Sequence, residues 1–312
     1  GQPEHAIEWA PFALAAAARA RKDGAEIDGI VGEALRDAGR YLEAKTRLAR
    51  ALASKDPLRG DRRALILVNV GSVELALGAP AAAEKSFTDA LAAATAQLGD
   101  GHPTLAIYYD KLAASARALG RIPDALALHE RSLAVRTAAY GADDRSTASS
   151  YLHRARTLLE AKRLDEALAD AKRAEAIRST QLGPTSARLG EVIVVQGDIA
   201  LAAGDKAAAL ALYTRAGEID PRIDLIARRA AAGADIPLDA LPVGLDPLTA
   251  DRAAALALRV AKLPPAEGAA LAAQLLDRFR ALPRPVDPAL AKAIADALHA
   301  ANNPAAEEVL RR

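Results

Sequence analysis

The stretch GRIPDALALHERSL, residues 120–133, recurs along the chain in four related versions. These are GRYLEAKTRLARAL from Gly39, GAPAAAEKSFTDAL from Gly78, KRLDEALADAKRAE from Lys162 and GDKAAALALYTRAG from Gly204. The starts at 78, 120, 162 and 204 are 42 residues apart, and the interval from 39 to 78 is 39 residues. A fixed period between about 20 and 50 residues is typical of stacked structural units. We therefore expect five copies of one supersecondary unit.

Small residues recur at fixed places around each start. The residues 7 positions before each start, 5 positions after it and 12 positions after it are always small. The residue 9 positions after each start varies in size. The small ones are Gly32, Gly71, Ala113, Ala155 and Gly197; Ala44, Ala83, Ala125, Ala167 and Ala209; and Ala51, Ala90, Ser132, Ala174 and Ala216; the variable ones are Leu48, Phe87, His129, Ala171 and Tyr213. Small side chains let two helices cross closely, and glycine at the start can adopt the left-handed conformation that ends a helix. Each unit is therefore predicted as helix A, a tight turn and helix B, and the pairs must stack to bury their apolar faces.

The composition predicts an all-α protein, and with the repeats an α-solenoid. Of the 312 residues, 51% are hydrophobic but only 3% are aromatic, and alanine and leucine supply most of the rest. Alanine and leucine favour helices, whereas strands favour β-branched and aromatic residues. The C-terminal part is expected to form further helical hairpins.

The charge balance and the cysteine count exclude several classes of function. The chain has 41 Lys and Arg against 40 Asp and Glu, so it lacks the basic excess expected of a nucleic-acid-binding protein. It has no cysteine, which excludes disulfides and thiol nucleophiles and fits a cytoplasmic location. The stretch 10–20 is too short to span a bilayer, so we expect no membrane insertion. Because residue 1 is Gly and methionine is absent, we expect a fragment that begins at a tag-cleavage scar.

The order small residue, turn, alanine, variable residue, small residue resembles the tetratricopeptide repeat over about residues 25–220. The 42-residue period, with LGDGHPTLA at 98–106 before helix A, resembles the longer variant found in kinesin light chains. The resemblance implies a superhelix whose concave groove is lined by the A helices and binds a peptide or protein partner. The alanine- and arginine-rich style also resembles the repeat regions that follow the catalytic domain in myxobacterial-type serine/threonine protein kinases.

Four regions are expected along the chain. Residues 1–24 form a helix, with Trp9 and Phe12 packing on the first hairpin. Residues 25–220 form five helical hairpins, and residues 221–248 form a short helix and a proline-rich linker. Residues 249–312 form two more hairpins, either degenerate repeats or a separate cap. The linker at 235–248 is extended and apolar, and we hypothesise that it fills the groove.

No motif for catalysis, a cofactor or a metal is found in the sequence. Phosphate loops, dinucleotide fingerprints, zinc helices and nucleophile elbows are missing, and no two of the five histidines have a metal-ligand spacing on one helix. His102 is expected to act in a turn or cap, and His129 to pack in the interior. We therefore predict a non-enzyme that needs no cofactor.

The residues that face the groove are the candidate partner-binding site. Asn69 is the central one, because the resemblance implies that an asparagine on helix A bonds the backbone of a bound peptide, and an amide offers both a donor and an acceptor. Arg117 and Arg156 could hold a carboxylate. Mixed charge signs do not predict binding of an acidic C-terminal tail. The full candidate set is Asn69, Ser72, Asp110, Arg117, Leu152, His153, Arg156, Glu191 and Asp198.

The function predicted is a non-catalytic scaffold that binds a protein or peptide in its groove. One alternative is the C-terminal regulatory or sensory region of a bacterial serine/threonine kinase, which would predict an upstream catalytic domain. A second alternative is an oligomerisation module, because alanine-faced helices at either end could pair with another copy. An enzyme within 221–312 would require a nucleophile–base pair, which the sequence there does not offer.

Overall fold

The computed structural model describes residues 3–19, 24–54, 60–220, 225–234, 241, 250–282, 286 and 288–310. Every regular secondary-structure element among these described residues is an α-helix, which confirms the all-α prediction. The chain divides into two compact units, Gly1–His153 and Arg154–Arg312, with the boundary inside one helix. Each unit is built of helices that pack on their neighbours along the chain.

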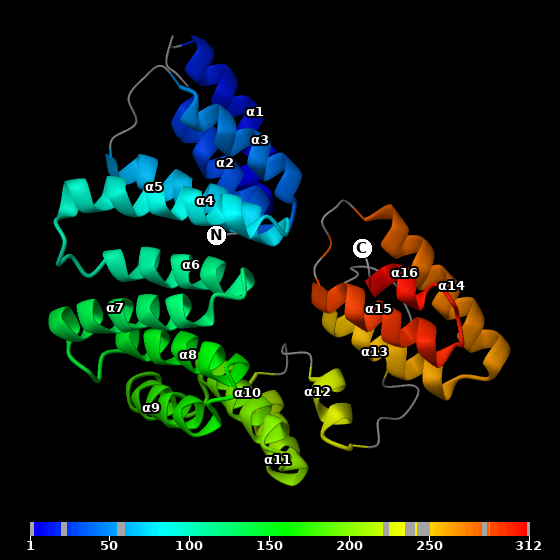
Figure 1. Cartoon of the computed structure of the whole chain (residues 1–312). Helices are drawn as coiled ribbons and strands as arrows, with labels where there is room; N and C mark the ends of the chain where they lie inside the picture. The colour runs from blue at the N-terminus through cyan, green and yellow to red at the C-terminus, as the bar shows by residue number, and fades with distance from the viewer. Residues whose placement is uncertain are drawn as a thin grey trace. The chain divides into compact units, whose positions relative to one another are not determined.

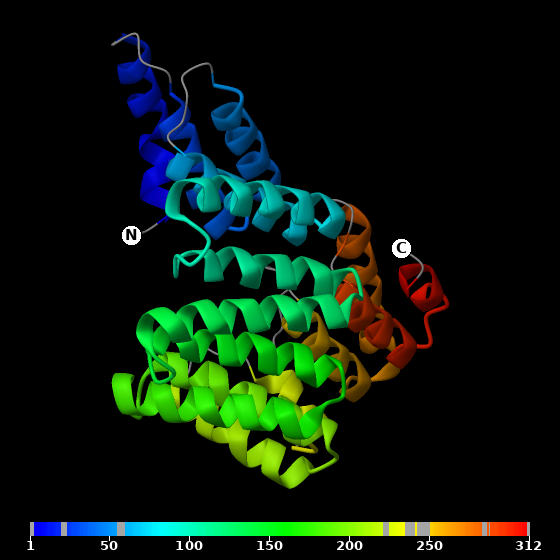
Figure 2. The same cartoon turned by 60° about the vertical axis from the view of Figure 1, so that its left-hand side comes forward.

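Unit 1, Gly1–His153, contains three helical hairpins after an N-terminal helix. The helices are α1 (Pro3–Arg19), α2 (Ala25–Asp37), α3 (Tyr41–Leu52), α4 (Gly60–Ala76), α5 (Pro80–Leu98), α6 (Leu105–Ala118), α7 (Ile122–Tyr140) and the first part of α8 (Arg145–Glu160). Helix A of each hairpin is α2, α4 or α6, and helix B is α3, α5 or α7 (Figure 1). Each B helix also packs on the next A helix or lies beside it, as the stack of helices in Figure 2 shows.

Unit 2, Arg154–Arg312, continues the hairpins and ends in a separate helical cluster. After the end of α8 come α9 (Leu164–Leu182), α10 (Ala187–Ala202), α11 (Lys206–Ile219), α12 (Ile226–Ala231), α13 (Ala250–Lys262), α14 (Pro265–Ala281), α15 (Pro288–Ala300) and α16 (Ala306–Leu310). Helix α10 packs on both α9 and α11. Helix α15 packs on α13, α14 and α16 around a hydrophobic core of its own that runs from Ala253 to Val309.

The variable helix B position packs directly on the small helix A position. A Cβ placed on Gly32, Gly71 or Gly197 would lie 2.5–2.6 Å from the side chain of Leu48, Phe87 or Tyr213, respectively. These three large side chains are fully buried. Glycine on helix A therefore makes room for the leucine, phenylalanine or tyrosine on helix B of these three units. Units with His129 or Ala171 on helix B have alanine on helix A instead.

The five predicted turns all end helix A in the left-handed conformation. Gly39, Gly78, Gly120 and Gly204 have φ between 71° and 85°, and Lys162 has φ 60°. The next residue in each turn donates its backbone N–H to a carbonyl five residues back, as in Arg121 to Ala116 and Arg163 to Leu158. This hydrogen bond satisfies one of the unpaired carbonyls at a helix end.

Replacing Lys162 with glycine will stabilise the protein by about 1 kcal/mol, because a side chain in the left-handed region costs roughly 1–2 kcal/mol. The converse change, Gly120→Lys, will destabilise it by a similar amount, since a Cβ there meets no atom within 4 Å and only the backbone conformation is at issue. Chemical denaturation of both variants checks the pair. Equal effects of the same sign would contradict this explanation.

The N-terminal helix packs differently from the prediction. Ile7 and Ala10 join the core formed by α2, α3 and α4, whereas Trp9 and Phe12 are 67% and 68% exposed. The expectation that the two rings pack on the first hairpin is therefore wrong, because they lie on the opposite side of α1 from Ile7 and Ala10. The rings lie against each other instead, with centroids 5.7 Å apart.

The connection after the last repeat is described only in part. Helix α12 is the short helix expected after Pro221. The linker at 235–248 lies outside the described residues except for Leu241, which is buried and whose carbonyl accepts a hydrogen bond from Arg259 at 3.3 Å. The proposal that this linker fills the groove stays a prediction, as do the boundaries of the four regions.

Candidate partner-binding site

The A helices of unit 1 form one continuous face. Helix α4 contacts both α2 and α6, so that A helices touch one another, whereas α3, α5 and α7 pack chiefly on A helices. The side of a helical stack on which neighbouring pairs approach most closely is its inner side. We define the A-helix face by Ile30 and Arg36 on α2, Leu65 and Asn69 on α4, and Ile107 and Lys111 on α6.

Three large hydrophobic side chains on this face are open to solvent. Ile30, Leu65 and Ile107 are 47%, 38% and 46% exposed, and each lies on a different A helix. Leu65 and Ile107 occupy the same register position, 42 residues apart. Single exposed apolar residues are common on protein surfaces, but three on adjacent A helices make this face the candidate for an interaction surface.

Polar side chains of the same helices contact one another on this face. Arg36 donates a hydrogen bond to the Asn69 side-chain oxygen and also pairs with Asp37 at 2.6 Å. Burial lowers the pKa of the Lys111 ammonium, the charge of Arg36 adds to the effect, and Asp110 opposes it. The residues at 36, 69 and 111 therefore come close together across three helices, although only 69 and 111 share a register position.

A buried ionic cluster centred on Asp110 lies in the interior beside this face. Asp110 Oδ2 accepts a hydrogen bond from Arg136 Nη1 at 2.8 Å, and its two oxygens lie 3.4 Å from Nδ1 of His129 and of His153. Asp110 and Arg136 are 9% and 8% exposed, and His129 is 4% exposed. The cluster joins α6, α7 and α8.

Hydroxyl groups complete the cluster around the guanidinium of Arg136. Arg136 Nη1 donates to Ser132 at 3.3 Å and to Ser150, and the two serine hydroxyls are 2.9 Å apart. Burial alone would raise the pKa of Asp110. The hydrogen bond from His129, the imidazole of His153 at 3.4 Å and the charge of Arg136 outweigh it and hold the pKa below its ordinary value. Asp110 is therefore a structural carboxylate that stays ionised.

The predicted candidates in unit 1 differ widely in accessibility. The His153 side chain is 41% exposed, and Ser72 and Arg117 are partly exposed. Asn69 is only 2% exposed and is held by Arg36, and Asp110 is held in the ionic cluster. Leu152 is 1% exposed, so its assignment to the groove lining is wrong: it packs in the interior, at the same register position as the buried Asp110.

The remaining candidates lie in unit 2. Arg156 and Glu191 are exposed, and Glu191 pairs with Arg178 at 3.2 Å. Asp198 accepts hydrogen bonds from the Tyr213 hydroxyl at 2.8 Å and from Arg228 Nε at 2.9 Å. Burial, and then the Asp198 carboxylate, raise the pKa of Tyr213. Asp198 thus anchors α11 and α12 to α10.

The sequence prediction missed the apolar part of the face. Ile30, Leu65 and Ile107 were not among the candidates, because an apolar residue on an amphipathic helix is ordinarily assigned to the core. The signal was present in the register, since Leu65 and Ile107 stand one helical turn before Asn69 and Lys111. The interpretations of two histidines are confirmed: His129 is buried, and His102 Nδ1 accepts a hydrogen bond from the Thr104 N–H at 3.2 Å.

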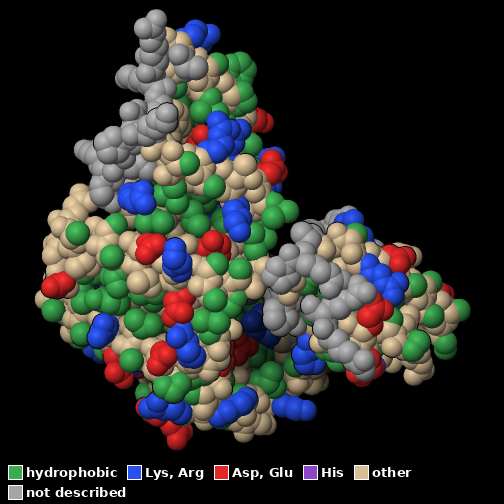
Figure 3. Space-filling view, turned by 45° about the horizontal axis from the view of Figure 1, so that its top comes forward, with side chains coloured by type: hydrophobic (Ala, Val, Ile, Leu, Met, Phe, Trp, Pro, Cys, Tyr) green, Lys and Arg blue, Asp and Glu red, His purple; other side chains and the backbone are tan. Residues whose placement is uncertain are grey.

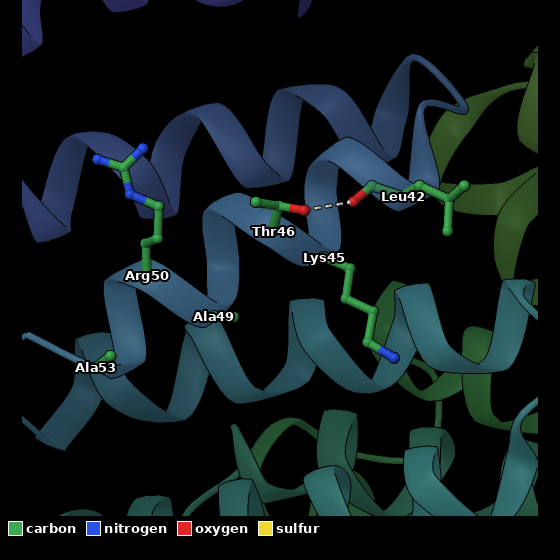
Figure 4. A pocket seen from close by; sticks show the side chains of 6 residues that line it. All are labelled: Leu42, Lys45, Thr46, Ala49, Arg50 and Ala53. Carbon is green, nitrogen blue, oxygen red and sulfur yellow. Dashed lines mark hydrogen bonds between the residues drawn. The ribbon is translucent and has the colours of Figure 1, made fainter.

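A separate shallow hollow lies on the outer side of α3. It is lined by Leu42, Lys45, Thr46, Ala49, Arg50 and Ala53, all from this helix or its end (Figure 4). Thr46 donates its hydroxyl hydrogen to the carbonyl of Leu42 at 3.0 Å, and Arg50 Nε lies 3.5 Å from the buried Asp28. Thr46 and Arg50 thus interact with groups of the chain itself, and a lining from one helix lacks the converging polar groups of a small-molecule site.

The described residues hold no group of three or more His, Cys, Asp or Glu side chains suited to a metal ion. None of the helices in the described ranges is long and apolar enough to cross a membrane. In the view of Figure 3, basic and acidic side chains are interspersed with hydrophobic ones over the part drawn in colour. This surface suits contacts with another protein better than contacts with a polyanion.

The fold and the register define the class of protein as an α-solenoid of helical hairpins. The family model of the tetratricopeptide repeat matches residues 62–138, 103–180 and 146–222, which together span just over half of the chain. The chain belongs to the tetratricopeptide repeat family. It is a non-catalytic repeat scaffold of the kind that mediates protein–protein interaction.

Solved structures show the same fold at low sequence identity. BtubC (BKLC) from P. vanneervenii is 21% identical with a TM-score of 0.57, over 76% of this chain and 95% of that one. The TPR-like repeats of a Podosopora anserina protein assigned as a kinesin light chain are 18% identical with a TM-score of 0.53, over 64% and 97%. The Rap conjugation gene regulator of plasmid pLS20, in complex with the Phr* peptide, is 14% identical with a TM-score of 0.59, over 92% and 71%. No curated protein matches the sequence.

Proposed function

We propose that the A-helix face of unit 1 binds an extended segment of a partner protein. The observation that carries this proposal is the set of three exposed hydrophobic side chains, Ile30, Leu65 and Ile107, on three adjacent A helices. Polar groups at Arg36 and Lys111 lie on the same helices as Ile30 and Ile107. A partner segment that alternates apolar and polar side chains matches this surface.

The apolar and the polar side chains of this face contribute to binding in different ways. Burying apolar surface contributes most of the affinity, at about 25 cal/mol per Å². Polar groups on a rigid helical frame set the register of the bound segment, because an unmatched polar group loses its hydrogen bonds to water. A solenoid holds both in fixed positions, so little ordering of the scaffold is needed.

The similarity to the Rap regulator supports the proposal at the level of architecture. That protein is described in complex with a peptide, and its fold covers 92% of this chain. At 14% identity the side chains of its site do not carry over, so the residues proposed for this chain depend on its own exposed face.

A pull-down with matched variants tests the proposal. The groove variant replaces the three exposed hydrophobic residues of the A helices, and the control variant replaces three exposed hydrophobic residues of the B helices. The groove changes are Ile30→Ser, Leu65→Ser and Ile107→Ser; the control changes are Leu42→Ser, Leu98→Ser and Tyr140→Ser. All six side chains are between 37% and 56% exposed, so both variants should keep their fold.

We expect the wild type and the control variant to retain a partner that the groove variant loses. The partner is identified by mass spectrometry, and titration with the purified partner measures the change in affinity. Losing contact with three apolar side chains should weaken binding by about 100-fold or more, at about 1.4 kcal/mol per factor of ten. If the control variant loses the partner and the groove variant keeps it, binding occurs on the B-helix side.

The narrower role, regulation of an attached serine/threonine kinase domain, stays a prediction, as does a cytoplasmic location. A kinase reading frame joined to the repeats would support the first. Its absence from the gene would leave a free-standing adaptor.

A further inference from the structure

The outer face of α1 combines aromatic rings, alanines and charges in a self-complementary order. Trp9 and Phe12 are 67% and 68% exposed. Ala15 and Ala16 are exposed on the same side, and so are the charged residues Glu8 and Arg19 near the two ends. At 100° per residue these six positions fall on one side of the helix, opposite the buried Ala10.

We propose that α1 is a self-association surface on which two copies of the chain pair antiparallel. A twofold axis between Ala13 and Leu14 places Glu8 of each copy opposite Arg19 of the second copy. The same axis places Phe12 opposite Ala15, so that a large side chain meets a small one. Trp9 then covers the alanine-rich last turn of the second copy. A single arrangement therefore pairs the charges at both ends of the stretch 8–19 and the apolar side chains at its centre.

Charge complementarity favours a second copy over an unrelated occupant. The face carries its acidic residue near the N-terminus and its basic residue near the C-terminus, which is the order that an antiparallel copy neutralises twice. A parallel copy would instead place Glu8 against Glu8 and Arg19 against Arg19. The apolar side chains between the two charges, Phe12 and Ala15, then contribute by excluding water.

The available area is consistent with a modest, reversible dimer. Aromatic side chains bury about 150–250 Å², so rings that are two-thirds exposed offer roughly 100–170 Å² each. The four rings of a pair thus supply about 400–650 Å², and the flanking residues bring the total near the lower limit of about 1,200 Å² for specific interfaces. We expect a dissociation constant in the micromolar range. This association is independent of the A-helix face, which lies on other helices.

Trp9 is the single tryptophan of the chain, so it reports pairing directly. Sedimentation velocity and tryptophan emission are measured on the full chain from about 1 µM to about 500 µM. Pairing should raise the mass to that of a dimer and shift the emission to shorter wavelength over the same concentration range. The variant Phe12→Ala, at an exposed position that leaves the fold intact, should abolish both changes. A chain that stays monomeric throughout, with constant emission, would overturn the proposal.

Charge exchange identifies the arrangement. Glu8→Arg alone and Arg19→Glu alone each place like charges together twice per dimer and should weaken self-association about tenfold. The double variant Glu8→Arg/Arg19→Glu should recover it, and an equimolar mixture of the two single variants should form a heterodimer. Dimers unaffected by either single change would show pairing through another surface or in parallel, and would overturn the antiparallel α1 pair.

Discussion

Replacing Asp110 with alanine will destabilise the α6–α7–α8 region by about 3–5 kcal/mol, because it leaves a charged group buried without its counter-ion. Arg136 is 8% exposed and loses its 2.8 Å hydrogen bond to the carboxylate, while His129 loses its acceptor. Hydrogen exchange of the amides in α6 and α7 measures the loss locally, and thermal denaturation measures it for the whole chain.

The double variant Asp110→Ala/Arg136→Ala is the control for this explanation. If the unpaired guanidinium causes the loss, removing it as well should make the double variant no less stable than Asp110→Ala alone, despite the larger cavity. Losses that simply add would show that the two side chains contribute by packing alone.

The same carboxylate predicts a dependence of stability on pH. The pKa of Asp110 in the folded protein lies below its unfolded value of about 3.9, so its contribution is complete above that pH and is lost as the pH falls further. The advantage of the wild type over Asp110→Asn in urea denaturation should therefore be constant from neutral pH to about pH 5 and shrink below about pH 4. An advantage that is unchanged at lower pH would contradict the lowered pKa.

Replacing Phe87 with alanine will cost about 3–5 kcal/mol, the usual loss for a fully buried aromatic ring. In the wild type, Gly71→Ala will also destabilise the protein, because the new Cβ would lie 2.5–2.9 Å from three atoms of the Phe87 ring. The overpacking penalty of about 1–3 kcal/mol exceeds the gain of about 0.5–1 kcal/mol from alanine in a helix.

In the Phe87→Ala background the sign of Gly71→Ala should reverse. The ring is then absent, the extra methyl fills part of the cavity, and alanine favours the helix. The resulting Ala/Ala pair is the combination that the fourth unit carries at Ala155 and Ala171. Urea denaturation of the wild type, both single variants and the double variant completes the cycle; equal effects of Gly71→Ala in both backgrounds would refute direct packing between the two positions.

Much of the fold could be predicted from the sequence because its constraints are local and repeated. A turn that needs a positive φ, and a small residue seven positions earlier, appear in each unit, so Gly78 and Gly120 could be recognised without any neighbour. Lys162 could be placed only by the period, since nothing in its own side chain favours that conformation.

The candidate site could be predicted only in part because accessibility depends on neighbouring helices. Asn69 and Asp110 stand on A helices as expected, yet both are buried, because adjacent A helices approach closely enough for Arg36 and His153 to reach them. Conversely, Ile107 is exposed although its residue type suggested core. The sequence therefore predicts which positions of different repeats are equivalent, whereas the packing of neighbouring helices determines which of these side chains are exposed to solvent.

The central claim is that a partner lies on the A-helix face, and site-specific photocrosslinking tests it most directly. A photoreactive phenylalanine analogue is placed at Ile107, 46% exposed on α6, and in a separate sample at Leu42, 56% exposed on α3. Both proteins are irradiated in lysate of the source organism, and the products are identified by mass spectrometry. We predict one discrete partner crosslinked from position 107 and none from position 42. A partner captured from position 42 and not from position 107 would contradict binding on the A-helix face.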